Sequence, residues 1–223
     1  MTTLTRLRLN PTSRSLLREL ADPVALHRRI MATFDHVDGA DARAQLGILW
    51  RLDTEGRHSP VLLVQSHQGS AWDRLPEGWA QQVDTKDIDP ALDAISSGQA
   101  LRFKLRANAT RKIDTKTGQD GIRRNGQRVP LRSAEAAVSW LRRHGESSGF
   151  RLVDGTGGPV VDVRPEAPTS GRRKNGTVTV EPVRFEGLLL VENPGALVSA
   201  IRSGIGPGKA FGCGLLSLAA LPR

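Results

Sequence analysis

Histidines are the side chains of this sequence best suited to acid–base chemistry near neutral pH, and one of the five stands in a distinctive setting. His27 is followed directly by Arg28 and Arg29. Nearby positive charge favours the neutral imidazole, which can accept a proton from a hydroxyl group. The pattern alone leaves two interpretations open. His27 is either a general base or acid, or an ordinary surface or packing residue.

The other four histidines have simpler explanations. His144 is expected to end a helix, where a cation is favoured by the helix dipole. His36, His58 and His67 lie in or beside an acidic region. No His, Asp or Glu cluster has a ligand spacing such as H-x-x-x-H, and no C-x-x-C occurs. We therefore predict no metal site and no cofactor.

The segment 204–214, with the sequence GIGPGKAFGCG, could bind a phosphate. It is not a P-loop, because Ser203 stands where the first glycine of that motif belongs and Ala210 replaces its magnesium-binding Ser or Thr. Its glycines would let backbone N–H groups approach a phosphate closely, with Lys209 adding charge. A glycine-rich connection without a ligand explains the composition equally well.

Basic side chains are concentrated between residues 102 and 151. This stretch holds thirteen Lys or Arg and four Asp or Glu, a net +9 that equals the charge of the whole chain. Residues 35–101, by contrast, carry eleven acids and five bases. A localised excess of arginine favours a phosphate-rich partner, and we prefer nucleic acid to the alternative of a solvated surface.

The aromatic content indicates how a nucleic acid would be recognised. Aromatic residues make up 4% of the chain, so stacking of unpaired bases is expected to be weak. Arginine suits the backbone of an A-form RNA stem, held by a strand and by a mobile basic loop or hairpin over 110–128. The predicted RNA-binding residues are Arg102, Lys104, Arg106, Arg111, Lys112, Arg123, Arg124, Arg128, Gly206, Gly208 and Lys209.

Several features predict a cytoplasmic protein without a membrane association. Cys213 is the single cysteine and cannot form an internal disulfide. No run of about 18 apolar residues occurs. The N-terminus alternates polar and apolar residues and lacks the apolar core of a signal peptide.

Periodicity and capping signals predict a β-α-β-β order in the first half. Asp22 is a suitable N-cap and Pro23 suits the first helical position. An acidic stretch over 68–98, rich in Gly, Pro and Asp, is interpreted in part as a linker. The predicted elements are a strand at Thr3–Leu9, helices at 13–20 and 22–34, and strands at 45–53 and 60–65.

The second half repeats this order more completely, as β-α-β-β-α-β. Ser133 and Asn193 are its expected helix caps, and Arg172 lies in a second basic loop over 168–176. We therefore predict an α+β fold of two tandem ferredoxin-like (RRM-like, βαββαβ) domains, over 1–90 and 99–223. The predicted elements are strands at 101–107, 150–153, 160–163, 177–191 (bent at Pro182) and 211–218, and helices at 133–144 and 193–203.

Four segments carry a resemblance to a known family. The run GIGPGKAFGCG resembles the glycine-rich loop of the CRISPR-associated repeat-RNA endoribonucleases, a branch of the RAMP superfamily. LRFKLRAN at 101–108, QRVPL at 127–131 and ALHR at 25–28 narrow the resemblance to the CasE family, the type I-E Cascade subunit. It extends over essentially the full chain.

The resemblance implies an endoribonuclease that binds the repeat hairpin of pre-crRNA and cuts at its 3′ side without a metal. The 2′-OH would attack its own phosphodiester, leaving a 2′,3′-cyclic phosphate and a 5′-OH. His27 would then be the general base or acid. The protein would stay on the mature crRNA with the other Cascade subunits as partners.

One departure from the family pattern bears on this activity. Family members often have a tyrosine about one turn before the histidine, whereas this chain has no tyrosine and holds Val24 there. A hydroxyl partner is therefore lost or replaced, and Arg28 or Arg29 is the candidate to stabilise the phosphorane instead. The alternative function is a catalytically weak or inactive subunit that still binds the RNA hairpin.

Overall fold

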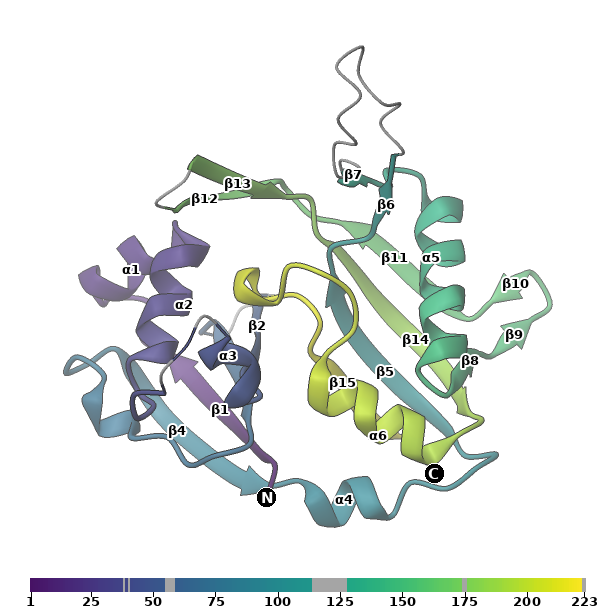
Figure 1. Ribbon diagram of the computed structural model, residues 1–223, viewed down its shortest axis with the longest axis horizontal. Helices are drawn as coiled ribbons and strands as arrows, with labels where there is room; N and C mark the ends of the chain where they lie inside the picture. The colour runs from purple at the N-terminus through teal and green to yellow at the C-terminus, as the bar shows by residue number, and fades with distance from the viewer. Residues whose placement is uncertain (38, 40, 55–58, 114–127, 174–175, 222–223) are drawn as a thin grey trace.

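Two antiparallel β-sheets, each with helices on one face, make up the protein in the computed structural model (Figure 1). The structure describes residues 1–37, 39, 41–54, 59–113, 128–173 and 176–221. The α+β class predicted from the sequence is therefore confirmed. None of the helices in these ranges is long and apolar enough to cross a membrane.

The first half forms a four-stranded sheet in the order β2-β3-β1-β4. Alternate residues of its first strand, among them Leu7 and Leu9, are fully buried against Leu26 and Ile30 of a helix. Asp22 caps that helix as predicted, since its carboxylate accepts a hydrogen bond from the backbone N–H of Val24. The elements are β1 (Thr3–Leu9), α1 (Arg14–Leu20), α2 (Pro23–Met31), α3 (Ala42–Gln45), β2 (Leu49–Asp53), β3 (Val61–Ser66), the 3₁₀ turn η1 (Trp72–Arg74) and β4 (Ala80–Asp87), followed by α4 (Asp89–Asp93) between the halves.

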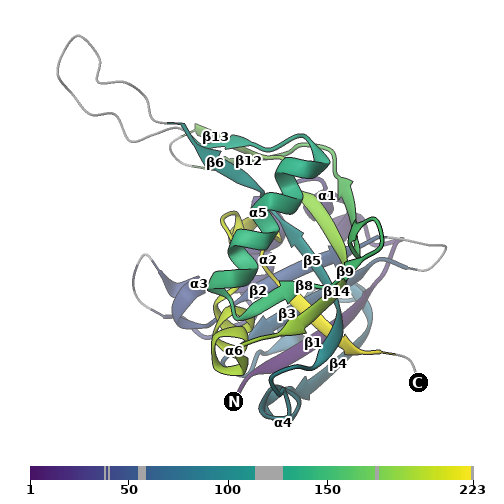
Figure 2. The same cartoon turned by 90° about the vertical axis from the view of Figure 1, so that its right-hand side faces the viewer.

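The second half has its main sheet in the order β11-β14-β5-β15, with β8 also paired to β14. Helices α5 and α6 lie over one face of this sheet (Figure 2). Ser133 and Asn193 cap these helices as predicted. The elements are β5 (Ala100–Ala107), β6 (Thr110–Lys112), β7 (Arg128–Pro130), α5 (Ala134–Ser147), β8 (Phe150–Leu152), β9 (Asp154–Gly155), β10 (Gly158–Pro159), β11 (Val161–Pro165), β12 (Thr169–Arg173), β13 (Gly176–Val180), β14 (Val183–Val191), α6 (Pro194–Ser203), the 3₁₀ turn η2 (Lys209–Phe211) and β15 (Leu216–Ala220).

Two predictions for the first half are wrong in part. The strand predicted over 45–53 begins only at Leu49, because α3 ends at Gln45 and Gly47 turns the chain with a φ of +62°. The acidic stretch predicted as a linker contains β4, which pairs with β1 along its whole length. Most of the β4 side chains are exposed, so it lacks the apolar alternation that would have identified it.

The second half differs from prediction in the segment before β14 and in the one before β15. The long strand predicted over 177–191 is two strands, separated at Pro182, and the first of them pairs with β12. The predicted basic loop over 168–176 is therefore largely one arm of a hairpin. In Figure 1 this hairpin extends from the second half over α2. The last strand starts at Leu216, after the turn η2.

Charged side chains join the two halves. Arg51 of β2, whose side chain is 3% exposed, pairs with Asp53 and donates to the backbone oxygen of Lys104 at 3.1 Å. Arg184 of β14, 7% exposed, donates to the same Asp53 at 2.8 Å and to Glu166 at 2.9 Å. Asp53 therefore bridges an arginine from each half.

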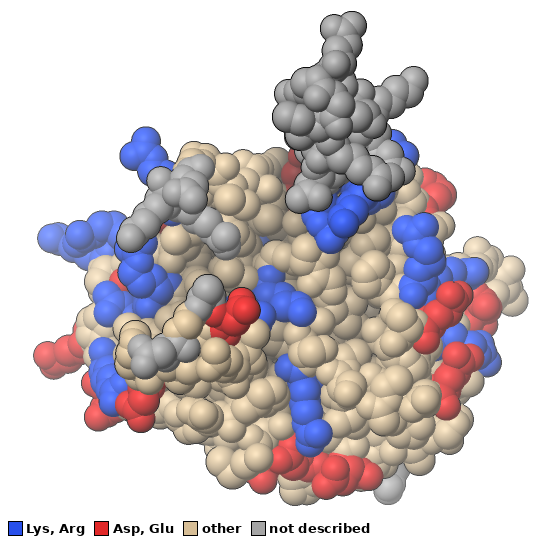
Figure 3. Space-filling model, viewed as in Figure 1, with Lys and Arg blue, Asp and Glu red and all other residues tan. Residues whose placement is uncertain are grey.

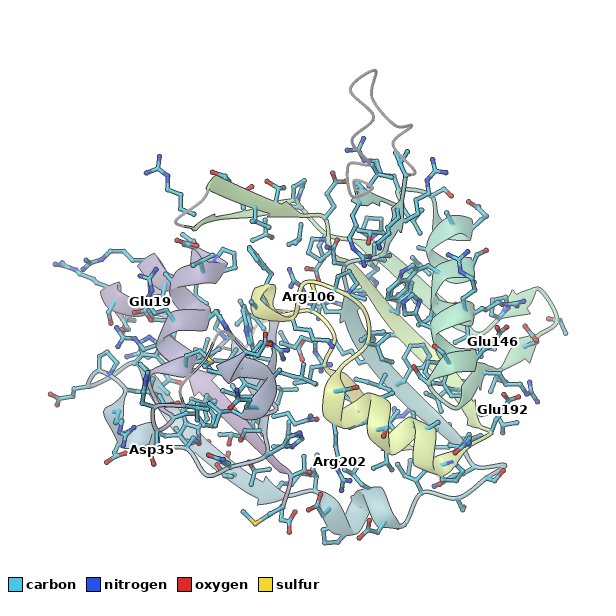
Figure 4. All side chains as sticks on the ribbon, in the orientation of Figure 1. Glu19, Asp35, Arg106, Glu146, Glu192 and Arg202 are labelled. Atoms are coloured by element: carbon cyan, nitrogen blue, oxygen red, sulfur yellow. The ribbon has the colours of Figure 1, made fainter. Side chains whose placement is uncertain are left out.

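The same network continues into the glycine-rich segment. Arg106 donates through Nε to Glu166 at 2.7 Å. Through Nη1 it donates to the backbone oxygen of Phe211, also at 2.7 Å. In Figure 4 Arg106 lies beside this segment. We call Arg51, Asp53, Arg106, Glu166 and Arg184 the seam network.

Replacement of Asp53 by Asn should lower the free energy of unfolding by roughly 3 kcal/mol, because it leaves buried arginine charge uncompensated. Burial raises the pKa of Asp53, but the hydrogen bond from Arg51 and the charges of Arg51, Lys104 and Arg184 lower it more, to a net value below 3.8. Asp53 thus contributes stability that is present above about pH 3.8 and lost as the pH falls through its folded pKa. Urea denaturation of wild type and D53N should show a gap that narrows in acid.

Asp162→Asn is the matched control, since Asp162 pairs with Arg164 on the surface with both side chains at least half exposed. It should change stability by less than about 1 kcal/mol. Equal losses for the two variants would contradict a special role of the seam network.

Candidate active site and nucleic-acid interface

Helix α2 carries two of the predicted catalytic residues, His27 and Arg28, on one of its sides. Pro23, Leu26 and Ile30 are buried in the core of the first half, which fixes the rotation of the helix. Val24, His27 and Arg28 have spacings of three and four residues and so share another side. His27 is half-buried and Arg28 is exposed.

That helix is packed against the second half at two places. It contacts the turn η2 of the glycine-rich segment and strand β12 of the hairpin. At Gly171 of β12 there is no room for a Cβ, since it would overlap a methyl group of Val24 and lie 3.3 Å from the ring of Phe211. The side of α2 that carries Val24 therefore faces the place where the β12–β13 hairpin meets the turn η2, and His27 lies on the same side.

The glycine-rich segment is a tight loop that needs its glycines. Gly206 has a φ of +77°, and a Cβ there would lie 2.8 Å from the ring of Trp140. The backbone N–H of Gly214 donates to the oxygen of Arg106 at 2.7 Å, and that of Phe211 to Gly208 at 2.8 Å. These contacts hold Lys209, the first residue of η2, at the surface between the halves.

A groove of about 610 Å³ runs along this loop. Its cations are Arg43, Arg128 and Lys209, and Glu181 is its one acid among the described residues. Glu181 is already paired with Arg132 at 2.9 Å. Figure 3 shows Lys and Arg side chains along the middle of this face, between the two halves. The groove can therefore hold an anionic chain close to α2.

The predicted basic hairpin is described only at its base. There Arg111, Lys112 and Arg128 are exposed on β6 and β7, next to the groove. The backbone of Gly206 and Gly208 lines the same groove. Arg123 and Arg124 lie outside the described residues. Of the predicted RNA-binding set, the hairpin base and the glycine-rich loop are thus brought together.

The three basic residues of β5 lie elsewhere. They alternate with buried residues and so face away from α5 and α6. Lys104 pairs with Glu186 at 2.9 Å, and Arg106 belongs to the seam network. Arg102 is exposed on that same face. The sequence identified these cations but not their acidic partners, which lie far away along the chain.

The two arginines beside His27 also differ. Arg29 donates twice to one carboxylate oxygen of Glu19 on α1, at 2.9 and 2.6 Å. The other oxygen of Glu19 accepts from the indole of Trp79 at 2.8 Å. Arg29 therefore joins two helices, whereas Arg28 points its charge to the surface.

Other candidate groups have structural explanations. His144 stacks on Trp140, with ring centroids 3.9 Å apart, and burial raises the pKa of Cys213 to about 11. His58 is outside the described residues. Within the described ranges no three His, Cys, Asp or Glu side chains are grouped so as to hold a metal ion.

Arg43 is the groove cation that the sequence did not predict. It lies on α3, within the stretch 35–101 that has an excess of acidic residues. Neither its spacing nor its neighbours distinguish it from a surface arginine. Only the folded arrangement brings it to the groove, beside Lys209.

Comparison with known proteins adds independent information. A family model described as CRISPR associated protein matches residues 3–220. The chain is 39% identical to the CRISPR-associated endoribonuclease Cse3 of Thermus thermophilus, over 97% of this chain and 99% of that protein. It is 37% identical to the CRISPR system Cascade subunit CasE of Escherichia coli, over 64% and 67% of the two chains.

A solved structure is similar over almost the same length. Thermus thermophilus Cse3 bound to an RNA representing a pre-cleavage complex superposes with a TM-score of 0.78 at 38% identity, covering 98% of each chain. The CasE-family resemblance of the sequence is thereby confirmed, and this chain belongs to the CRISPR-associated protein family, in its Cse3/CasE branch.

Proposed function

We propose that this protein is a CRISPR-associated endoribonuclease that binds the repeat hairpin of pre-crRNA, cuts at its 3′ side and stays on the mature crRNA. The names of its relatives, an endoribonuclease and a Cascade subunit, support both the activity and the partners. The observation that carries the proposal is the packing of the His27 helix on the glycine-rich turn, beside a basic groove.

In this proposal the reaction needs no group beyond the RNA and side chains of the protein. A base removes the proton of the 2′-OH, whose oxygen attacks the adjacent phosphorus. The bond from phosphorus to the 5′-oxygen then breaks, and that oxygen takes up a proton. The products are a 2′,3′-cyclic phosphate and a 5′-OH, and no metal takes part.

His27 is the general base or acid in this proposal. Its side of α2 borders the junction where the groove, the hairpin and η2 meet, so it can reach a phosphodiester that lies along the loop. Arg28 on the same side is better placed than Arg29 to balance the developing charge, because Arg29 is held by Glu19. Lys209 is a second cation for the phosphate.

The RNA stem is held by the hairpin base and the glycine-rich loop. Arg111, Lys112 and Arg128 are exposed and suit the phosphates of an A-form stem. We assign Lys104 and Arg106 structural roles instead, since their charges are engaged by Glu186 and Glu166, and Arg106 also bonds to the glycine-rich loop. Arg102, Arg123 and Arg124 remain candidates for binding.

We further propose that the halves are two ferredoxin-like domains, over 1–90 and 99–223, in a cytoplasmic protein. In each main sheet the strands follow the spatial order second, third, first, fourth, with antiparallel neighbours, as in a βαββαβ fold. In the first half the second helix of that pattern is replaced by the turn η1.

One observation favours the alternative of a weak or inactive hairpin-binding subunit. Val24 supplies only methyl groups to the junction, against Gly171. A hydroxyl that could share proton transfer with His27 is therefore missing from that turn. Slow cleavage with tight binding would follow.

Replacement of His27 by Ala should decrease the single-turnover cleavage rate about 10²–10⁴-fold, as expected for loss of a general acid or base. Binding of the repeat hairpin should change little. The measurement uses saturating protein, cognate repeat RNA and EDTA, with a 2′-deoxy nucleotide at the cut site as the RNA control. A strict requirement for magnesium would contradict this mechanism. Tight binding without cleavage by the wild-type protein would support the alternative of an inactive hairpin-binding subunit.

Arg28→Ala and Arg29→Ala should have different effects. The first should slow the cleavage step roughly 10²-fold with normal thermal stability, because a charge facing the phosphate is lost. The second should lower the melting temperature, because the Glu19 pair is lost, and leave the rate of the folded protein nearly unchanged. Cleavage kinetics and thermal unfolding of both variants check this, and a slower rate only for Arg29→Ala would reverse the assignment.

Simultaneous replacement of Arg111 and Lys112 by Gln should weaken hairpin binding and reduce its dependence on salt. Each lost phosphate contact lowers the slope of log K against log salt by about 0.9 on a duplex, so a decrease of roughly 2 is expected. Filter binding at several salt concentrations measures it. Arg142→Gln, on the exposed side of α5, is the control, and an unchanged slope in the double variant would contradict the assignment.

A further inference from the structure

A second hollow lies beyond the groove, where α3 and α6 meet. It has a volume of about 390 Å³ and is built from both halves of the chain. Its lining residues are Arg43, Ala44, Gly47, His67, Ser199, Arg202, Ser203 and Lys209. We call it the Arg43 pocket.

The charge of the pocket is strongly positive. Arg43, Arg202 and Lys209 line it together with His67, and no acid among the described residues does so. Asp41 does not line the pocket, but its negative charge interacts with Arg43. Asp89 accepts a hydrogen bond from Arg202 at 3.1 Å. The three cations therefore line a pocket that has no carboxylate among its described lining residues.

Two groups of the pocket, Lys209 and His67, have surroundings that disfavour their charged forms. Burial and then the charge of Arg43 lower the pKa of Lys209. Burial, followed by the charges of Arg202 and the N-terminus, lowers the pKa of His67, although Asp89 opposes this. An anion in the pocket would relieve these repulsions.

The cations are also positioned before any ligand binds. Arg43 donates to the backbone oxygen of Ile48 at 3.0 Å, which orients its guanidinium. The stem of Lys209 lies against Gly214, and the ring of His67 lies directly on Gly47. Arg202 is fixed at the end of α6, next to α4 (Figure 4). Such prior ordering reduces the entropic cost of binding.

The pocket adjoins the proposed RNA groove, since Arg43 and Lys209 line both. We propose that the Arg43 pocket binds a phosphodiester of the single-stranded RNA next to the hairpin, with Arg43 as its principal contact. Its small volume admits one strand and not a duplex. This inference rests on the proposed function and adds the path of the strand that leaves the stem.

The test compares four RNAs: the repeat hairpin alone, the hairpin with a 5′ flank, the hairpin with a 3′ flank, and the flank as a free single strand. Arg43→Gln should weaken binding of one flanked RNA about tenfold, and weaken the corresponding free strand too. Its effect on the hairpin alone should be smaller than on that flanked RNA, although Arg43 also lines the groove. The flanked RNA whose binding is weakened identifies which flank lies in the pocket. Arg43→Lys should restore part of the affinity.

A neutral phosphate provides a second measurement on the unaltered protein. Methylphosphonate replacement of one flank phosphodiester should cost a similar factor, and should cost nothing further in Arg43→Gln. Arg142→Gln removes one charge far from the pocket and should leave all four affinities nearly unchanged.

Failure of the pocket proposal and failure of the proposed function would give different results. If wild type binds and cuts the hairpin but neither flank responds to Arg43→Gln or to any methylphosphonate, the pocket proposal is wrong and the proposed function stands. If the hairpin is neither bound nor cut, the proposed function fails, and the free strand still decides whether Arg43 binds RNA.

Discussion

The arrangement of the whole molecule depends on the seam network of buried arginines and carboxylates between the sheets. Burying such charges costs several kcal/mol for each ion unless partners and hydrogen bonds compensate it. Here Asp53 accepts from an arginine of each half, and Glu166 accepts from Arg184 and Arg106. We infer that its main contribution is to specify one arrangement of the halves, because any other arrangement would leave these charges unpaired.

That arrangement has a direct consequence for the chemistry. Arg106 extends the network to the backbone of Phe211, and so ties the glycine-rich loop to the β5 strand. Helix α2 packs on this loop from the other half. The distance between His27 and Lys209 thus depends on the Arg106 bond to the loop and on the packing of α2 against η2. Positioning of this kind matters because small displacements of a reacting group cost large factors in rate.

Local signals in the sequence predicted much of the fold but little of the pairing between distant residues. Asp22, Ser133 and Asn193 act as helix caps where they were expected, since a cap depends only on its nearest neighbours. Strand β4 was missed because its exposed side chains show no alternation. The site shows the same division: His27 and the glycine-rich segment were identifiable, whereas Arg43 was not. The acidic partners of Lys104 and Arg106 are 51 or more residues away along the chain, beyond any local pattern.

The central claim is that the cut phosphate lies between the α2 helix of one half and the glycine-rich loop of the other. A crystal structure of the protein with an uncleavable repeat hairpin, 2′-O-methylated at the cut site, tests it most directly. We expect a ring nitrogen of His27 within about 2.6–3.2 Å of that 2′-oxygen or of the 5′-oxygen, and the ammonium of Lys209 beside the same phosphate. A scissile phosphate on the face of β5 that carries Arg102, far from His27, would contradict it.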